Sequence, residues 1–295
     1  MIRTSALVIA AGAVALASLA CTINIPSTQF SPKIELGPTG SFAIGPEQTQ
    51  DFNIPATGSA AGLHIAFAAG KLQLSGGGEE LLTGTATYNV SDLKPVVEGS
   101  GASFRVRSGE VEGFPATAMI DLVNTWELTL GPDPVDLTLE LGAAKAEIDL
   151  GDVPVTQLTV KTGATDLELD FSSPNSVSMD SFTVAAGAAR LDLRGLANAN
   201  TNHMEISLGG GDLNLDFSGD LTEGLDVTID GAAGNFTINV PQGTAASLIT
   251  NGALISVHPE TGWTSGGDGY IHEGRGPKIG IRLTAGAGNV NLRTR

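Results

Sequence analysis

Acidic side chains recur at alternate positions of several similar segments, a spacing that suits carboxylate chemistry. In AEIDL, LELDF and LDLR, acids alternate with apolar residues. If these segments stack in register, Asp149, Glu168 and Asp192 form one outward column without a basic partner. Such carboxylates bind a cation weakly, or act as acid and base in solenoid enzymes that cleave polysaccharides. A solvated acidic face also explains the column, so the three acids are a candidate binding site and not a catalytic one.

Two further columns alternate acids with arginine. Their members are the triplets Asp166–Arg190–Asp212 and Asp170–Arg194–Asp216. Neighbouring strands in a sheet lie about 4.8 Å apart, so each arginine is expected to pair with the acids on both sides of it. The pattern therefore predicts two ladders of ion pairs along one face.

Four histidines are candidates for the base that a nucleophilic serine needs: His64, His203, His258 and His272. The sequence contains no G-x-S-x-G, H-E-x-x-H or P-loop motif, and no helix is expected after its three consecutive glycines at 209–211. His258 and His272 share one segment, but two histidines make a weak metal site. We therefore expect no catalytic residue, no metal and no cofactor.

Trp263 and Tyr270 lie in the same polar segment, residues 258–280. Aromatic rings in such an insertion can stack on a sugar or anchor a protein partner, and we take both residues as binding candidates. The alternative is that they fold over the end of the structure and cover its core.

The first twenty residues are typical of a secretory leader. Arg3 gives the amino-terminal end a positive charge, and an apolar run from Leu7 to Ala20 is too short for a stable membrane span. The run ends in SLAC, which resembles the bacterial lipobox although serine stands where leucine is usual. This resemblance implies acylation of Cys21, the one cysteine of the chain, and stable anchoring by two or more acyl chains. Ordinary cleavage at the same position, leaving a free thiol, is the alternative.

The body of the chain repeats one pattern. Each repeat has a pair of apolar residues separated by one position, then a group of three small residues, then a second pair of apolar residues separated by one position. Rows begin at Leu63, Leu139, Leu158, Phe182, Met204, Val227, Ala246 and Ile281. Alternation predicts strands with one buried face, and small residues suit stacked corners. We predict an all-β fold, a single-chain parallel β-solenoid (a right-handed β-helix) with coils of about 21–24 residues. A β-sandwich is the alternative.

This interpretation divides the chain into three parts. Residues 1–20 are the lipoprotein signal peptide, and residues 21–57 are the acylated cysteine, a tether and the first strands. Residues 58–295 are the solenoid, with insertions at about 79–136 and 258–280.

The composition excludes one class of partner. The chain has 15 basic and 32 acidic residues, a formal net charge of −17, and no basic run. Binding to phosphates requires clustered lysine and arginine, so we expect no nucleic-acid partner. The body has no cysteine for a disulfide.

The rows also resemble a known family. LELGAAKAEIDL, LTVKTGATDLELDF and IRLTAGAGNVNL, with LLTGTATYNVSDLKPVV before them, look like the bacterial toast-rack domain family. The segment from ASLITNGALISV to the C-terminus is similar to the C-terminal domain of LiaF-like cell-envelope stress regulators. These resemblances imply an envelope-facing solenoid with a binding or sensing role and no catalytic signature.

The sequence thus predicts an exported, non-enzymatic protein that is held to the cell membrane by its N-terminal lipid, or to the outer membrane in a diderm. We expect it to present a solenoid for adhesion, ligand binding or envelope sensing, with an envelope protein or a glycan as partner. The alternative is a carbohydrate-active enzyme, a polysaccharide lyase or glycosidase, on a β-helix scaffold.

Overall fold

The structure, a computed structural model, describes residues 44–109 and 121–295, and most of these residues lie in β-strands. The early strands are β1 (Gln48–Ile54), β2 (Ala61–Ser75), β3 (Leu82–Tyr88), β4 (Val96–Ser100), β5 (Ser103–Arg107) and β6 (Asn124–Leu130). The long central strands are β7 (Val135–Asp149), β8 (Val155–Asp170), β9 (Ser181–Arg194), β10 (His203–Asp216) and β11 (Leu225–Val240). The last are β12 (Thr244–Asn251), β13 (Leu254–Pro259), β14 (Trp263–Gly266), β15 (Gly269–His272) and β16 (Arg275–Thr294). Two 3-10 helices, η2 (Ser91–Leu93) and η4 (Leu196–Ala199), lie in loops.

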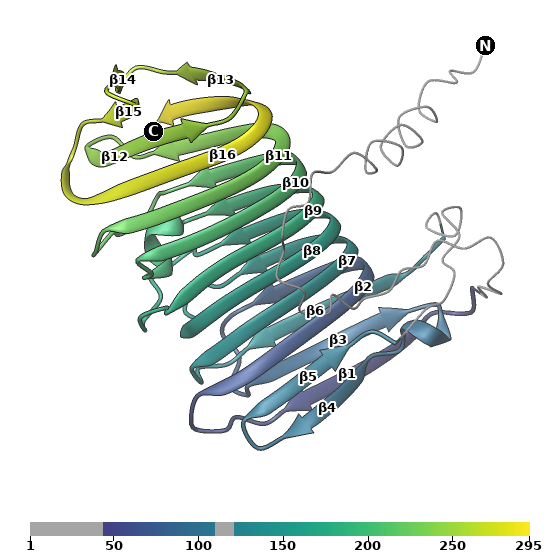
Figure 1. Cartoon of the computed structure of the whole chain (residues 1–295). Helices are drawn as coiled ribbons and strands as arrows, with labels where there is room; N and C mark the ends of the chain where they lie inside the picture. The colour runs from purple at the N-terminus through teal and green to yellow at the C-terminus, as the bar shows by residue number, and fades with distance from the viewer. Residues whose placement is uncertain (1–43, 110–120) are drawn as a thin grey trace, which may run out of the picture. The chain divides into compact units, whose positions relative to one another are not determined.

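Each long strand bends once near its middle, so that one strand supplies two walls of a coil. In β7 the buried positions before the bend include Leu139 and Leu141, and those after it include Ala146 and Ile148. The inward positions therefore change from odd to even numbers at the bend, as they must if both walls face a common interior. We call the part before the bend the first arm and the part after it the second arm. Figure 1 shows the strands curving together on one side of the stack.

The bend falls on one column of glycine and alanine. Its members are Ala68, Gly142, Gly163, Gly187, Gly209, Ala232 and Gly286. A Cβ at Gly187 would lie 2.9 Å from the carbonyl oxygen of Gly163, and one at Gly209 would lie 2.9 Å from that of Gly187. Larger side chains would therefore collide with the backbone of the neighbouring coil.

The first arms stack on one another to form one wall of the solenoid, and the second arms stack to form the other wall. The first arms and the strands that extend them follow the order β4-β5-β2-β7-β8-β9-β10-β11-β16-β12-β15-β14. The second arms follow the order β1-β3-β6-β2-β7-β8-β9-β10-β11-β16-β13. Leucine, isoleucine, valine and phenylalanine side chains fill the space between the two arms along the whole stack.

The predicted all-β, solenoid-like fold is confirmed, but the expectation of a purely parallel β-helix is wrong. Strands β2, β7 to β11 and β16 pair in parallel. Strands β1, β3 and β6 pair antiparallel, as do β4 with β5, and β15 with both β12 and β14. These antiparallel pairs lie at the two ends of the stack, beyond the repeated coils. An antiparallel strand can follow its neighbour after a short turn, so hairpins extend the sheet there without a further coil. The handedness of the solenoid stays a prediction.

The predicted coil length is correct, but the coils do not all stack in the order of the sequence. Leu137, Leu158, Phe182, Met204 and Val227 succeed one another in one column, with the predicted spacing of 21–24 residues. The last coils do not stack in chain order, however: β16 pairs with β11, and β12 and β13 pair with the far edge of β16. The row at Ala246 is thus the outer coil, split into two strands, and the row at Ile281 lies inside it.

Two predicted rows, those at Leu139 and Ala246, are out of register by two residues. Ala246 pairs with Ile279 and not with Ile281. Leu137, and not Leu139, pairs with Leu158, and Gly142 rather than Ala144 takes the bend beside Gly163. The small residues of AAKA, which begins at Ala143, resemble those of the other bends and favour an alignment of Ala144 with Gly163. In the structure Gly142, two residues earlier, lies at the bend. The shift places Lys145 outward, beside Asp166.

Adjacent glycines in β10 provide a matched test of the bend. Gly209→Val should lower the free energy of unfolding by about 1–3 kcal/mol, since its side chain enters an occupied space. A Cβ at Gly210 meets its nearest atom, the carbonyl oxygen of Ala233, at an ordinary 3.6 Å. Gly210→Val should therefore change stability by less than about 0.5 kcal/mol. Denaturant unfolding of both variants tests this, and equal losses would contradict the assignment of the bend.

Candidate functional site

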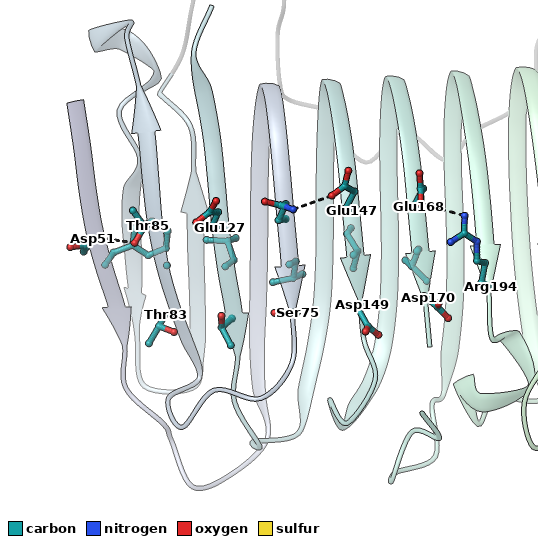
Figure 2. Close-up of a pocket in the computed structure, with 18 residues that line it drawn as sticks. Asp51, Ser75, Thr83, Thr85, Glu127, Glu147, Asp149, Glu168, Asp170 and Arg194 are labelled. Atoms are coloured by element: carbon teal, nitrogen blue, oxygen red, sulfur yellow. Dashed lines mark hydrogen bonds and ion pairs between the residues drawn. The ribbon is translucent and has the colours of Figure 1, made fainter. Parts of the chain in front are cut away.

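An open groove crosses the outer face of the second arms near the N-terminal end of the stack. Its volume is about 780 Å³, and its lining comes from seven neighbouring strands, β1, β3, β6, β2, β7, β8 and β9. Figure 2 shows these side chains on successive strands of one sheet face. The groove therefore exists only because the N-terminal hairpin strands continue the sheet formed by the long coils.

The polar lining of this groove is strongly acidic. It contains six carboxylates and one cationic group, together with four hydroxyl side chains. These residues are Asp51, Glu127, Glu147, Asp149, Glu168, Asp170, Arg194, Ser75, Thr83, Thr85 and Thr129. We call this surface the acidic groove. Its charge favours a cationic ligand, because like charges gathered on one face raise the local concentration of counter-charge.

The three acids predicted as binding residues lie at or beside this groove. Asp149 and Glu168 line it, and Asp192 follows Glu168 in the sheet register. They do not form one column, however. Glu147, Glu168 and Asp192 share a column, whereas Asp149 belongs to the column of Asp170. The cause is the two-residue error in the register of β7.

The expectation that this column has no basic partner is also wrong. Arg194 donates to Glu168 Oε2 at 3.3 Å and forms an ion pair with Asp192. The hydrogen bond and charge of Asp192 raise the pKa of Arg194. The guanidinium therefore stays charged and neutralises part of the C-terminal side of the groove.

The predicted arginine ladders place Arg190 and Asp170–Arg194 in the correct register, but none of the four predicted ion pairs forms. Arg190 pairs in the sheet with Asp166 and Asp212 but forms no ion pair with any described residue. Arg194 turns to Glu168 and Asp192 instead of making ion pairs with Asp170 and Asp216. Asp216 instead forms an ion pair with Arg295, with 2.5 Å between Asp216 Oδ2 and Arg295 Nη1. Long side chains can reach diagonal neighbours, so register alone does not select partners.

Glu147 is held ionised at the centre of the acidic groove. Its carboxylate lies 2.9 Å from Lys145 Nζ and 3.6 Å from Lys71 Nζ, and it accepts a hydrogen bond of 3.0 Å from Gln73 Nε2. The hydrogen bond from Lys145, with that from Gln73, lowers the pKa of Glu147. Lys145 has a raised pKa for the same reason.

Asp170 is in the opposite situation. Burial is the largest cause that raises its pKa, and the neighbouring Asp149 adds to the increase, while Arg194 opposes it. Asp149 itself accepts hydrogen bonds from the Ser172 hydroxyl and the Gly151 amide. Asp170 and Asp149 are thus neighbouring carboxyls in different surroundings.

The described residues contain no group of three or more histidine, cysteine or acidic side chains that could hold a metal ion. The acids of the groove lie along the strands and do not converge. The arrangement therefore suits an extended cationic ligand better than a single ion.

The two predicted aromatic binding residues have different surroundings. Trp263 is 6% exposed, belongs to the core, and donates its indole N–H to the carbonyl oxygen of Arg293 at 3.3 Å. It packs beside His272, with ring centroids 5.3 Å apart, so it covers the end of the core and cannot stack on a ligand. Tyr270 is half-buried against the same core. Neither lines the acidic groove. Cys21 lies outside the described residues.

Several groove residues could not be found from the repeat. Asp51, Thr83, Thr85 and Glu127 come from β1, β3 and β6, which pair antiparallel and belong to no predicted row. Thr85 donates a hydrogen bond to Asp51 at 2.7 Å across these strands. Their alternating polar positions signalled exposed strand faces, but nothing in the sequence indicated which sheet they join.

Fold and groove together define a solenoid-like β-protein with an acidic groove on one face. Residues 43–181 match the family model described as the N-terminal domain of toast_rack, DUF2154, and this match supports the resemblance of the rows to that family. A comparison with curated proteins finds no match. The similarity of the C-terminal segment to LiaF-like regulators stays a prediction.

Solved structures with a similar fold come from several bacteria. A candidate cell adhesion protein from Clostridium sporogenes is 17% identical, with a TM-score of 0.50, over 85% of this chain and 100% of that one. A candidate adhesin from Bacteroides fragilis is 13% identical, with a TM-score of 0.41, over 84% of this chain and 97% of that one. At such identities the first likeness supports the fold alone. In residues 44–109 and 121–295, no helix has the length and apolar character needed to cross a membrane.

The opposite pKa shifts of Asp170 and Glu147 predict opposite mutational effects. The ionised form of Asp170 costs stability above its raised pKa, so Asp170→Asn should raise the melting temperature at pH 7, by at most about 2 °C for a partly exposed group. Glu147→Gln should lower it, because a depressed pKa contributes stability above the ordinary value.

The Asp170 effect should vanish below the ordinary aspartate pKa of about 3.9, and the Glu147 effect should be lost as the pH falls through its lowered pKa, because folded and unfolded chains are then protonated alike. Thermal melts between pH 3 and pH 7 measure this. Changes of the same sign in the two variants at pH 7 would contradict the assigned environments.

Proposed function

We propose that the chain is a lipid-anchored, non-enzymatic protein of the cell envelope that presents its solenoid for adhesion, ligand binding or envelope sensing. The observation that carries the proposal is the acidic groove, whose six carboxylates face one cationic group within the lining. A rigid strand surface of one charge suits recognition of an oppositely charged partner. The partner we favour is a basic, extended segment of an envelope protein.

A glycan is the other ligand class consistent with the hydroxyl and carboxylate lining. Sugar sites usually offer an aromatic ring for stacking, and the lining contains one aromatic residue, Phe52, which is packed against the core. The glycan therefore ranks second. The names of the similar structures concern adhesion and agree with a surface role, which we extend to this chain as part of the proposal.

The anchor completes the proposal. Cys21 carries the lipid, and the solenoid lies outside the cytoplasm at the cell membrane, or at the outer membrane of a diderm. The leader sequence and the single cysteine that follows it support this location.

The groove is tested with an octalysine peptide as probe. The triple variant Asp149→Asn, Glu168→Gln, Asp170→Asn should weaken binding about tenfold, since each exposed ion pair contributes ~0.2–1 kcal/mol. Raising the salt concentration should weaken wild-type binding further. Isothermal titration of the full chain in non-ionic detergent measures both effects.

A matched control removes three exposed charges elsewhere, with Asp180→Asn, Asp226→Asn and Asp230→Asn. This control should bind the peptide nearly as well as the wild type. If both triple variants lose affinity equally, general charge and not the acidic groove attracts the peptide, and the proposed site is wrong.

The anchor is tested by labelling cells with a radioactive fatty acid. The wild-type chain should incorporate label and sediment with membranes, whereas Cys21→Ala should incorporate none and be poorly processed or shed. Equal labelling of the two chains would remove the lipid anchor from the proposal.

The second candidate function, a carbohydrate-active enzyme, is favoured by one observation. Asp170 has a raised pKa beside the hydrogen-bonded Asp149, a pairing found in glycosidases. Reducing-end assays on envelope polysaccharides test it: turnover that Asp170→Asn abolishes would establish an enzyme, and no turnover by the wild type would leave binding as the function.

A further inference from the structure

Within residues 44–109 and 121–295, both ends of the strand stack present sheet edges that pair with no further strand. The N-terminal end finishes in β1 and β4, each of which pairs on one side only. The C-terminal end finishes in β13 and β14, which also pair on one side only. Open edges expose backbone groups that can pair with another strand.

Exposed apolar side chains are confined to the same two ends. Among the described residues, the exposed large hydrophobic side chains are Ile44, Val97, Ile249, Leu254 and Ile271. The first two lie beside β1 and in β4, and the last three lie in β12, β13 and β15. Leu254 is the most exposed, at 73%. The long central coils contribute none, so the apolar exposure belongs to the ends and is not a general property of the surface.

The two ends carry opposite charge. Residues 241–295 contain five basic and three acidic residues, a net charge of +2. Residues 44–109 and 121–134 contain four basic and nine acidic residues, a net charge of −5. The C-terminal end is therefore positive on a chain whose total charge is −17.

Three cations at the C-terminal end have no ion-pair partner among the residues that the structure describes. Arg275, Lys278 and Arg282 form no ion pair with any described residue, although the chain has more than twice as many acids as bases. Arg282 lies opposite the exposed Ile249 in the pairing of β16 with β12. Charge and apolar surface thus occur side by side on this end.

From these features we propose that the C-terminal end of one chain binds the N-terminal end of a second copy, head to tail. Strands β13 and β14 of one copy meet β1 and β4 of the next, so that both apolar ends are covered and the opposite charges face one another. A second copy fits better than an anionic membrane, which would explain the basic end but would leave the apolar, acidic end without a partner. This contact is independent of the ligand proposed for the acidic groove.

Complementary end variants test the arrangement. Leu254→Asp damages the C-terminal end and Val97→Asp the N-terminal end, and each should weaken self-association of the full chain at least about tenfold, because it buries a carboxylate against apolar side chains. An equimolar mixture should form dimers and nothing larger, since one intact end remains on each chain. Sedimentation velocity in non-ionic detergent measures this, and each variant alone controls for shared micelles.

Gln157→Asp adds the same charge at an exposed position in the middle of the stack and should associate like the wild type. Dimers of Val97→Asp alone would overturn the proposal in favour of contact between two C-terminal ends. A wild-type chain that stays monomeric, or that associates only with anionic phosphatidylglycerol vesicles, would also overturn it. Circular dichroism confirms that each variant is folded.

Discussion

The structure depends on the close approach of backbones at the bend. Neighbouring coils are about 4.8 Å apart, and at this distance the bend column leaves room for hydrogen or a methyl group. Gly142, Gly163, Gly187 and Gly209 follow one another there, and a Cβ on any of the last three would lie 2.9–3.1 Å from the carbonyl oxygen of the glycine in the preceding coil. Because every coil must place a small residue at this point, the bend fixes the register of both arms. The buried columns and the outward columns follow from that register.

The register also determines the charge pattern of the outward columns. On the second arms, acids dominate between β1 and β9, and Arg194 closes the acidic groove. Farther along, asparagine replaces the acids: Asn235 donates to Asp212 at 2.8 Å, and Asn289 donates to Asn235 at 3.1 Å. Amides satisfy one another across coils without repulsion, so the charge of this face is concentrated at its N-terminal part. The same solenoid therefore presents an acidic groove at one end and, at the other, cations that form no ion pair with the described residues.

Much of the fold could be predicted from the sequence, because buried columns repeat a physical requirement. The alternation in β8, β9, β10 and β11 was interpreted in the correct register. The row at Leu139 failed because small residues flank Lys145 and imitate the bend. The insertion of β16 between β11 and β12 could not be predicted. The rows at Ala246 and Ile281 have the same pattern, so either could pair with β11. The acidic groove was predicted in part, through Asp149 and Glu168, because its remaining acids come from strands outside the repeat.

The most direct test of this account is a disulfide across the coils that pair out of chain order. Asn235 and Asn289 are direct partners in β11 and β16, and both are exposed. In a Cys21→Ala chain, Asn235→Cys with Asn289→Cys should oxidise to an intramolecular disulfide, since partners in adjacent strands lie within the Cα range of about 4.4–6.8 Å. Peptide mapping under non-reducing conditions identifies the bond. If the coils stacked in chain order, β12 and β13 would separate these residues, and no bond between them would form.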